Sequence, residues 1–229
     1  WHMLRNGRFG NWSAPGAGKT IGALFAATML ESQLTIVLCP LQVVPTWQKE
    51  IDNAYANGKR VHRTHAAGTW KPPADTNFLL LHYDMLQQKN VAADIAALVK
   101  LHGSRVGLII VDEVHRGKND GTIGQGDAGK RYAGIVALTK ALPQAKLLIQ
   151  TGTPLQTKCA EAISLLGLIA PDVNGEYGFS GRTGLPEAIR IHWAMSRYGV
   201  RFRPRIRHAG RDLKRLAPTV EPADKANPK

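Results

Sequence analysis

Four short apolar runs, separated by helix-forming segments, restrict the folds open to this chain more than any other feature. The runs are rich in Leu, Ile and Val and show little polar alternation, which is typical of strands buried on both faces. Because helical patterns lie between them, we predict βαβ units and an α/β fold with a mostly parallel central sheet flanked by helices. The predicted strands are Thr35–Cys39, Phe78–His82, Leu108–Asp112 and Lys146–Thr151, with a shorter one at Phe9–Trp12.

Between the strands, apolar residues recur at helical spacing. The first helix opens at Lys19-Thr20, and its stripe is amphipathic. The residues of this stripe are Ile21, Leu24, Phe25, Thr28 and Met29. Further helices are predicted over Pro45–Tyr55, Val91–Leu101, Arg131–Ala141, Cys159–Ile169 and Pro186–Tyr198. The glycine-rich stretch from Gly117 to Gly129 predicts a surface loop, and the segment from Asp172 to Gly184 is rich in turn-forming residues.

Length and charge limit the class of protein. A chain of 229 residues with 44% hydrophobic content can bury one sizeable core. Its formal net charge of +13 favours polyanions as partners, and nucleic acid is the first of these. The alternative is that the excess of Lys and Arg only keeps the chain soluble.

Cysteine content and hydropathy favour a cytoplasmic location, or the nucleoid or nucleus if the partner is DNA. Cys39 and Cys159 are the two cysteines, and they form no CxxC pair, so neither a disulfide framework nor a zinc site is indicated. The sequence contains no run of 18 apolar residues, and it does not begin like a signal peptide.

The segment SAPGAGKT, from Ser13 to Thr20, has the features of a phosphate-binding loop. It lies between a short predicted strand and the first helix. Glycines allow backbone N–H groups to converge on phosphate oxygens, and the helix N-terminus adds a partial positive charge. Lys19 would reach the β- and γ-phosphates of ATP, and the Thr20 hydroxyl would bind Mg²⁺. The candidate nucleotide-binding residues are Pro15, Gly16, Ala17, Gly18, Lys19 and Thr20. Ser13 departs from the strict pattern, which has glycine at that position.

Two further strands end in residues that suit the same site. Asp112 and Glu113 follow the third apolar run, and the carboxyl ends of parallel strands are where such sheets bind ligands. Asp112 would orient Mg²⁺, and Glu113 would act as general base toward the attacking water. Thr151 and Thr153 follow the next run and could sense the γ-phosphate by hydrogen bonding to the acidic pair or to water. Taken alone, the acidic pair could be a solvated strand end and the threonine segment an ordinary turn.

Together these segments resemble the motifs of Snf2-like ATPases of helicase superfamily 2, in the family's order. The similar segments are SAPGAGKT at 13–20, VLCPL at 37–41 through WQKEI at 47–51, LLLHYDML at 79–86, DEVHRGKN at 112–119 and TGTPLQ at 151–156. The resemblance extends over roughly Phe9 to Pro171 and implies the first RecA-like domain of a DNA-translocating motor. It also implies ATP and Mg²⁺ as cofactors and double-stranded DNA, gripped through its phosphates without sequence preference, as partner.

The resemblance further implies which residues face DNA. Pro40, Leu41 and the Thr151, Gly152, Thr153 turn would lie on the DNA side. Trp47 would lie near them, although a tryptophan on an amphipathic helix is also a typical core residue. Farther along, Arg201, Arg203, Arg205 and Arg207 alternate with other residues, so an extended strand would place all four on one face, suited to a phosphate backbone. The open alternative is that this segment packs on a further domain.

Three departures from the family's pattern bear on function. Eighteen residues precede Lys19, and they contain no evident glutamine motif for reading adenine. The segment after the acidic pair is longer and richer in glycine than is usual in the family. A second RecA-like domain, with the arginines that complete the ATP site, is not found in the sequence. The chain by itself is therefore expected to hydrolyse ATP weakly, unless a second domain on another chain supplies these groups.

We predict three segments from these observations: a RecA-like ATP-binding domain at 1–171, a basic connector at 172–217 and a disordered tail at 218–229. The leading hypothesis is the ATP-binding first motor domain of a Snf2-like DNA-dependent ATPase. The alternative is a nucleotide-dependent DNA-binding or regulatory module that does not hydrolyse ATP. A third hypothesis is an unrelated P-loop enzyme, such as a phage packaging ATPase.

Overall fold

The computed structural model describes residues 7–55, 58, 61–63, 70–114, 126–154 and 159–202. They form a seven-stranded sheet in the order β3-β4-β2-β5-β6-β1-β7, and every strand pairing in it is parallel. The strands are β1 (Arg8–Asn11), β2 (Leu34–Cys39), β3 (Val61–Arg63), β4 (Phe78–His82), β5 (Val106–Asp112), β6 (Lys146–Gln150) and β7 (Gly199–Val200). The predicted α/β class with a parallel sheet is confirmed.

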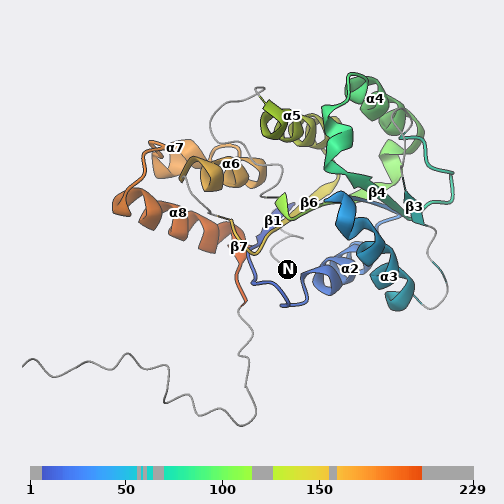
Figure 1. Cartoon of the computed structure of the whole chain (residues 1–229), viewed down its shortest axis with the longest axis horizontal. Coiled ribbons are helices and arrows are strands. Elements are labelled where there is room, and N and C mark those ends of the chain that lie inside the picture. The colour runs from blue at the N-terminus through green and yellow to red at the C-terminus, as the bar shows by residue number, and fades with distance from the viewer. Residues whose placement is uncertain are drawn as a thin grey trace, which may run out of the picture.

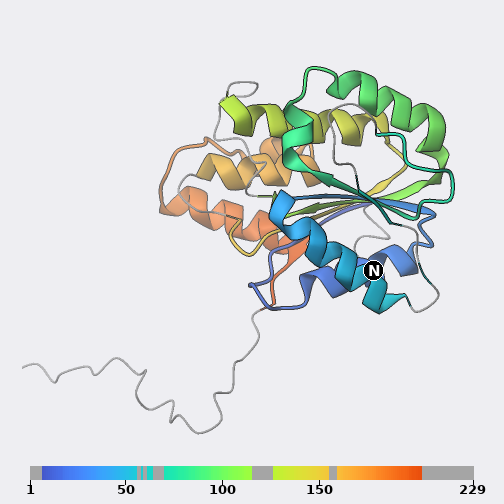
Figure 2. The same ribbon diagram turned by 45° about the vertical axis from the view of Figure 1, so that its right-hand side comes forward.

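Helices cover both faces of this sheet (Figure 1). They are α2 (Lys19–Met29), α3 (Val44–Ala54), α4 (Val91–His102), α5 (Gly126–Ala141), α6 (Cys159–Ile169), α7 (Val173–Tyr177) and α8 (Leu185–Tyr198). Short 3-10 turns lie at Leu41–Val43, Tyr83–Gln87 and Gly103–Arg105. The rotated view shows α2 and α3 below the sheet and α4, α5 and α6 above it (Figure 2). The fold therefore has three layers.

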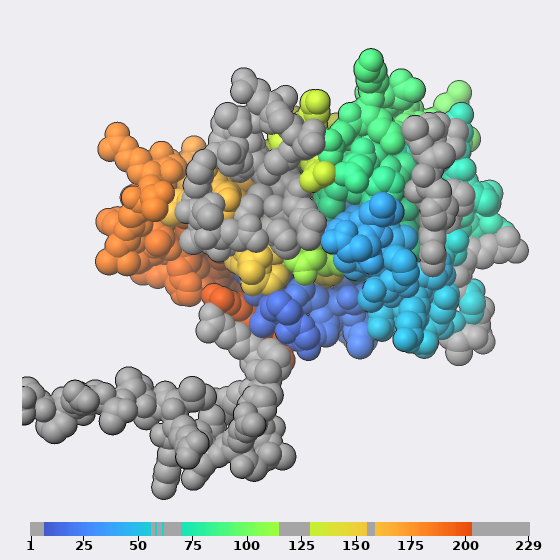
Figure 3. Space-filling view, viewed as in Figure 1, coloured from blue at the N-terminus to red at the C-terminus, as the bar shows by residue number. Residues whose placement is uncertain are grey.

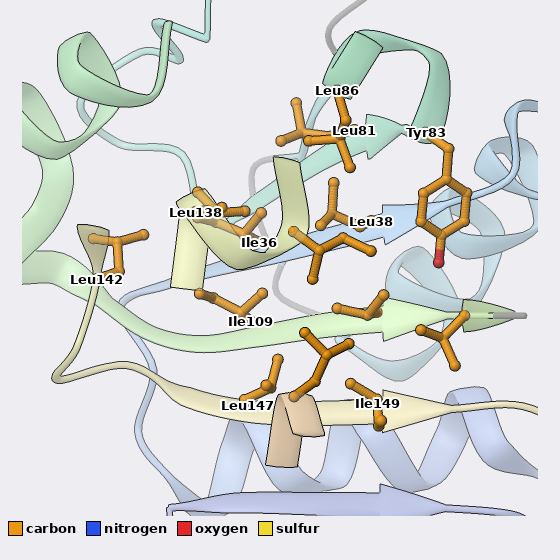
Figure 4. Packing of buried hydrophobic residues seen from close by; sticks show 14 of the residues in the cluster. Ile36, Leu38, Leu81, Tyr83, Leu86, Ile109, Leu138, Leu142, Leu147 and Ile149 are labelled. Carbon is orange, nitrogen blue, oxygen red and sulfur yellow. The ribbon is translucent and has the colours of Figure 1, made fainter. Parts of the chain in front are cut away.

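Residues of the central strands alternate between two apolar clusters because successive strand side chains point to opposite faces. On β5, Ile109 and Val111 join the cluster beneath α4, α5 and α6, whereas Leu108 and Ile110 join the cluster beneath α2 and α3. Figure 4 shows the larger cluster, in which Ile36, Leu81 and Ile149 from three different strands project toward the same layer. Burial on both faces explains why these strands are apolar throughout.

The predicted central strands match the structure to within two residues at either end. Strands β3 and β7 were not predicted, because strands of three and two residues are too short to show a recognisable sequence pattern. They are strands because the edges of an existing sheet offer them hydrogen-bond partners. Helix α6 has the predicted bounds, Cys159–Ile169.

The predicted stripe on the first helix is wrong in its orientation. Helix α2 buries Ala23, Leu24 and Ala27, whereas Ile21, Phe25 and Met29 are 64%, 65% and 56% exposed. Small residues face the sheet, since alanine permits a close approach of the helix to the strands. The larger apolar residues therefore point away from the core, and Leu24 alone of the apolar stripe residues is buried.

Two loop predictions also need correction. Helix α5 begins at Gly126, inside the stretch predicted as a loop from Gly117 to Gly129. Buried Ile135 and Leu138 anchor this helix on the sheet, and that packing outweighs the poor helix propensity of glycine near its start. Residues 115–125 lie outside the described residues. The turn-rich segment from Asp172 to Gly184 contains α7, which Val173 anchors in a small apolar cluster.

The segment after Pro171 is integrated into the same sheet. Helix α8 packs against α6 and β1, and β7 pairs with β1 at the edge of the sheet. Trp12 is buried at the junction of β1, β7 and α8. It is 2% exposed, and its Nε1 donates a hydrogen bond of 3.0 Å to the Met195 carbonyl oxygen. Within the described residues, no helix is long and apolar enough to cross a membrane.

The Trp12 junction predicts the effect of a glycine substitution. A Cβ at Gly199 would overlap the Trp12 indole and the Gly10 carbonyl oxygen, so Gly199→Ala is expected to destabilise the fold by about 1–3 kcal/mol. Urea unfolding followed by circular dichroism measures the change. Gly175→Ala is the matched control, because a Cβ there meets nothing within 4 Å. Equal stability of the Gly199→Ala variant and the native chain would show that the junction is loosely packed.

Candidate functional site

Three of the predicted motif segments meet at the carboxyl edge of the sheet. Strand β6 lies between β1 and β5, and Gln150 is in register with both Asn11 and Asp112. Because neighbouring parallel strands lie about 4.8 Å apart, Asn11 and Asp112 are separated by on the order of 10 Å. The phosphate loop, the acidic pair and the threonine segment therefore leave the sheet side by side. Figure 3 shows the three segments, coloured blue, light green and yellow, meeting near the middle of one face.

The phosphate loop has an open, glycine-dependent conformation. Gly16 and Gly18 have φ angles of +74° and +75°, which other residues adopt only at a cost. A Cβ at either position would meet nothing within 4 Å, so the space above the loop is free. Gly18 caps the N-terminus of α2, and Lys19 and Thr20 form its first turn. The N–H groups in the first turn of α2 have no acceptor within the helix, so this helix N-terminus suits an anionic phosphate group.

Lys19 is folded back over its own loop. Its Nζ donates hydrogen bonds to the carbonyl oxygens of Ser13, at 3.1 Å, and Ala14, at 3.3 Å. Both bonds are to neutral acceptors, so an anion in the loop could replace them with stronger bonds in which donor and acceptor are both charged.

Asp112 is a buried carboxylate with a donor on each oxygen. It is 5% exposed. Trp47 Nε1 donates to Oδ2 at 2.8 Å, and Gln150 Nε2 donates to Oδ1 at 2.9 Å. Tyr83 adds a bond of 2.7 Å from its hydroxyl to the Asp112 carbonyl oxygen. Burial raises the pKa of Asp112 above its ordinary value, and the bonds from Trp47 and Gln150 oppose that shift. The carboxylate is thereby held in one orientation at the sheet edge.

Glu113 diverges from Asp112 because the backbone turns sharply between them. Its φ angle is +51°, in the left-handed region, which is uncommon for a residue other than glycine. Such strain is concentrated at functional sites. Glu113 is partly exposed and lines a cavity of about 350 Å³. The other residues that line it are Pro15, Pro40, Gln42, Val43, Gly152 and Thr153.

This cavity brings together residues from four of the predicted motifs. Pro15 belongs to the phosphate loop, Pro40 to the segment after β2, Glu113 to the acidic pair and Thr153 to the segment after β6. Glycine at position 152 allows the segment after β6 to approach the phosphate loop, because a Cβ there would lie 2.8 Å from Pro15 Cδ. A larger cavity, of about 420 Å³, is lined by Thr28, Tyr55 and Arg105 among others, and none of the motif residues takes part in it.

The sequence pattern did not assign a role toward Asp112 to the two residues that orient it. Trp47 was predicted near the DNA side with the core as its alternative, and the structure buries it completely. A buried indole N–H needs an acceptor, and the strand end at Asp112 supplies it. The spacing of Val44, Trp47 and Ile51 on α3 was the available signal for burial. Gln150 carried no signal, because a single glutamine at a strand end has no distinctive pattern.

The threonines and the candidate DNA-facing residues lie at the same edge. Thr151 is fully buried, and its hydroxyl accepts a hydrogen bond of 3.1 Å from the Thr153 backbone N–H. Pro40 is buried, whereas Leu41, Thr153 and Arg201 are exposed. Arg203, Arg205 and Arg207 lie outside the described residues, as do His115, Arg116, Leu155 and Gln156.

A parallel sheet with a glycine loop opening a helix after β1 and an acidic pair after β5 defines a P-loop domain of the RecA type. The chain belongs to the SNF2-related domain family, whose model matches residues 13–181. The family implies use of ATP as nucleotide.

Individual relatives agree with this assignment. The chain is 30% identical over 180 residues to the probable ATP-dependent DNA helicase CHR23 of Arabidopsis thaliana, covering 69% of this chain and 14% of the relative. It is 26% identical over 195 residues to the Arabidopsis thaliana protein CHROMATIN REMODELING 4, covering 75% of this chain and 8% of the relative. The chain thus spans a small part of these proteins.

Solved structures support the fold. The SWI2/SNF2 ATPase core of Sulfolobus solfataricus in complex with dsDNA matches with a TM-score of 0.62 and 21% identity, over 88% of this chain and 41% of that one. The Sulfolobus solfataricus SWI2/SNF2 ATPase core domain matches with a TM-score of 0.62 and 22% identity, over 87% and 40% of the two chains.

The bond from Trp47 to Asp112 predicts a metal-dependent effect. Trp47→Phe keeps most of the ring but removes the donor, so Mg²⁺-dependent nucleotide affinity is expected to fall about tenfold, as is typical when a residue that orients a metal-binding carboxylate is removed. Removal of a bond to the charged form also raises the pKa of Asp112 further. The deficit should therefore grow as pH is lowered. Titration of a fluorescent nucleotide with Mg²⁺ measures both effects.

Trp70→Phe is the matched control for this prediction. Trp70 is also fully buried, but it belongs to the cluster on the other face, and its Nε1 has no hydrogen-bond partner among the described residues. Its substitution should leave nucleotide affinity unchanged. An equal fall in affinity in both variants would indicate a general packing effect instead of an effect on Asp112.

Proposed function

We propose that this chain is the ATP-binding first motor domain of a Snf2-like, DNA-dependent ATPase. The observation that carries the proposal is the meeting of the phosphate loop, Glu113 and the Gly152–Thr153 turn around one cavity of about 350 Å³ at the carboxyl edge of the sheet. The family assignment supports ATP as the nucleotide. The residues at this edge also suit Mg²⁺, since a hydroxyl, a carboxylate and phosphate oxygens are the ligands it prefers.

Each residue has a proposed part in the reaction. The N–H groups of residues 16–20, which follow Pro15, bind phosphate oxygens, and Lys19 releases the Ser13 and Ala14 carbonyls to reach the β- and γ-phosphates. Thr20 and Asp112 would hold Mg²⁺, which would supply positive charge to neutralise the phosphates. Glu113 faces the cavity and accepts a proton from the water that attacks the γ-phosphorus. Thr151 and Thr153, beside the loop, report the presence of the γ-phosphate.

Double-stranded DNA is the proposed partner. The net charge of +13 supports a polyanionic partner. One structural match is an ATPase core in complex with dsDNA, and one relative is a probable ATP-dependent DNA helicase. The proposed contacts are Leu41, Gly152, Thr153, Arg201, Arg203, Arg205 and Arg207, whereas Pro40 and Thr151 of the predicted set are buried and do not contact DNA directly. Contacts of this kind to phosphates give binding without sequence preference. The proposed location is the cytoplasm, or the nucleoid or nucleus if the cellular context requires it.

Hydrolysis by this chain alone is proposed to be weak. In P-loop ATPases an arginine from a second domain or partner raises turnover by about a thousandfold or more. The chain covers 41% of the matched Sulfolobus ATPase core, so a further RecA-like domain, on the same protein or another chain, is proposed to complete the site.

The proposed roles predict phosphate release that requires both Lys19 and Glu113. The native chain should release phosphate slowly, and faster when duplex DNA is added. Glu113→Gln should bind nucleotide but lower turnover by at least about a hundredfold, because a general base is removed. Lys19→Ala should weaken nucleotide binding itself. A coupled phosphate assay, run with a nucleotide titration, separates these two effects.

Glu31→Gln is the control for this experiment. Glu31 is also a glutamate with a left-handed backbone, at φ +50°, but it lines the cavity of about 420 Å³ instead of the cavity around Glu113. Its substitution should leave phosphate release unchanged. ATP binding without phosphate release in any condition, even with an added second-domain chain, would favour the non-hydrolysing DNA-binding module.

DNA affinity should depend steeply on salt through the arginine segment. Replacing Arg201, Arg203, Arg205 and Arg207 by Ala should lower the slope of log K against log salt by up to about 3.6, or about 0.9 for each phosphate that is no longer neutralised. Fluorescence anisotropy with two unrelated duplexes measures the slope and the lack of sequence preference. As a control, alanine replaces four exposed lysines on or beside α4 and α5: Lys89, Lys100, Lys130 and Lys140. Equal slopes for the two variants would exclude the arginine segment as the DNA-binding segment.

A further inference from the structure

The chain that leaves α8 runs along the first half of the phosphate loop. Strand β7 pairs with β1, with Gly199 opposite Gly10 and Val200 opposite Asn11 (Figure 1). The hydrogen bonds continue past the end of both strands. Trp12 N–H donates to the Val200 carbonyl oxygen at 2.7 Å, and Ala14 N–H donates to the Phe202 carbonyl oxygen at 3.0 Å.

A side chain completes this ladder. Phe202 N–H donates a hydrogen bond of 2.9 Å to the Ser13 hydroxyl oxygen. Ser13 is 4% exposed, and it holds the position at which the strict phosphate-loop pattern has glycine. A glycine there could not accept the Phe202 N–H. Ser13, which departs from the pattern, is therefore the residue that binds Phe202.

Phe202 and Lys19 hold the same two residues of the loop. Phe202 bonds the Ser13 hydroxyl and the Ala14 N–H, whereas Lys19 Nζ bonds the Ser13 and Ala14 carbonyl oxygens. When Lys19 turns toward a phosphate group, it must leave these carbonyls. The bonds to Phe202 then remain to hold this half of the loop in place.

The junction behind these bonds is tightly packed. The Trp12 indole fills the space over Gly10 and Gly199, where any Cβ would overlap it, and bonds the Met195 carbonyl oxygen at the end of α8. A displacement of α8 or of the Val200–Phe202 segment would therefore be transmitted to Trp12, Ser13 and Ala14.

We infer that Ser13 is a positioning residue for nucleotide binding, which couples the shape of the phosphate loop to the Val200–Phe202 segment. The inference rests on the proposed function, since it assumes that the loop binds phosphate groups. Coupling of this kind is reciprocal: bound nucleotide stabilises the docked Val200–Phe202 segment, and release of that segment weakens nucleotide binding.

Two pairs of variants test the inference from opposite sides of the bond. Ser13→Gly restores the strict loop pattern but removes the acceptor, and Ser13→Ala removes it without adding backbone freedom. Phe202→Pro removes the donor without altering the loop, whereas Phe202→Ala keeps the N–H and changes only a side chain that is 57% exposed. Ser13→Gly, Ser13→Ala and Phe202→Pro should each bind a fluorescent ADP about tenfold more weakly than the native chain, which is a typical size for the coupling between two linked sites. Phe202→Ala should bind as the native chain does.

Hydrogen exchange of the native chain supplies an independent readout. Adding ADP and Mg²⁺ should slow amide exchange in the peptide that contains residues 199–202, and circular dichroism confirms that each variant is folded. Three outcomes would each overturn the inference and leave the proposed function standing. The first is native affinity in Ser13→Gly and Phe202→Pro, and the second is equally weakened binding in Phe202→Pro and Phe202→Ala. The third is unchanged exchange at 199–202 on nucleotide binding. Absence of nucleotide binding by the native chain would instead overturn the proposed function itself.

Discussion

Parallel pairing of β5, β6 and β1 is the constraint on which the candidate site depends. Three strands that run in the same direction must end at the same edge, so the segments that follow them leave the sheet together. The register of Gln150 with both Asn11 and Asp112 sets their spacing. Gly152 then lets the segment after β6 touch Pro15 of the phosphate loop. The cavity of about 350 Å³ lined by Pro15, Glu113 and Gly152 is a consequence of this arrangement.

Burial at that edge shifts the pKa values of its ionisable groups toward their neutral forms. Burial and the nearby Asp112 raise the pKa of Cys39 to about 12, and the same causes raise the pKa of Tyr83 well above its ordinary value. Both groups therefore stay neutral near pH 7. Asp112 is also destabilised as an anion by burial, but Trp47 and Gln150 each donate a hydrogen bond to it. These two donors, which belong to α3 and β6, favour the ionised carboxylate and so oppose the rise in its pKa.

The parts of the fold that were predictable are those with a strong local signal. Strands β2, β4, β5 and β6 are apolar throughout because helices cover both of their faces, and the phosphate loop is defined by glycines with a following Lys-Thr. Strands β3 and β7 carried no such signal, since each depends on an edge made by distant residues. The stripe on α2 was misread because its apolar residues are on both sides of the helix, and the close approach to the sheet favoured Ala23 and Ala27 as the buried ones.

The sequence by itself determined the class of fold, the phosphate loop and the acidic pair, because each is encoded in a short contiguous segment with a physical requirement of its own. Tertiary structure alone decided which groups surround them. Trp47 and Gln150 lie 65 and 38 residues from Asp112 along the chain, and Phe202 lies 189 residues from Ser13. Contacts over such separations depend on strand order and helix packing, which no local pattern specifies.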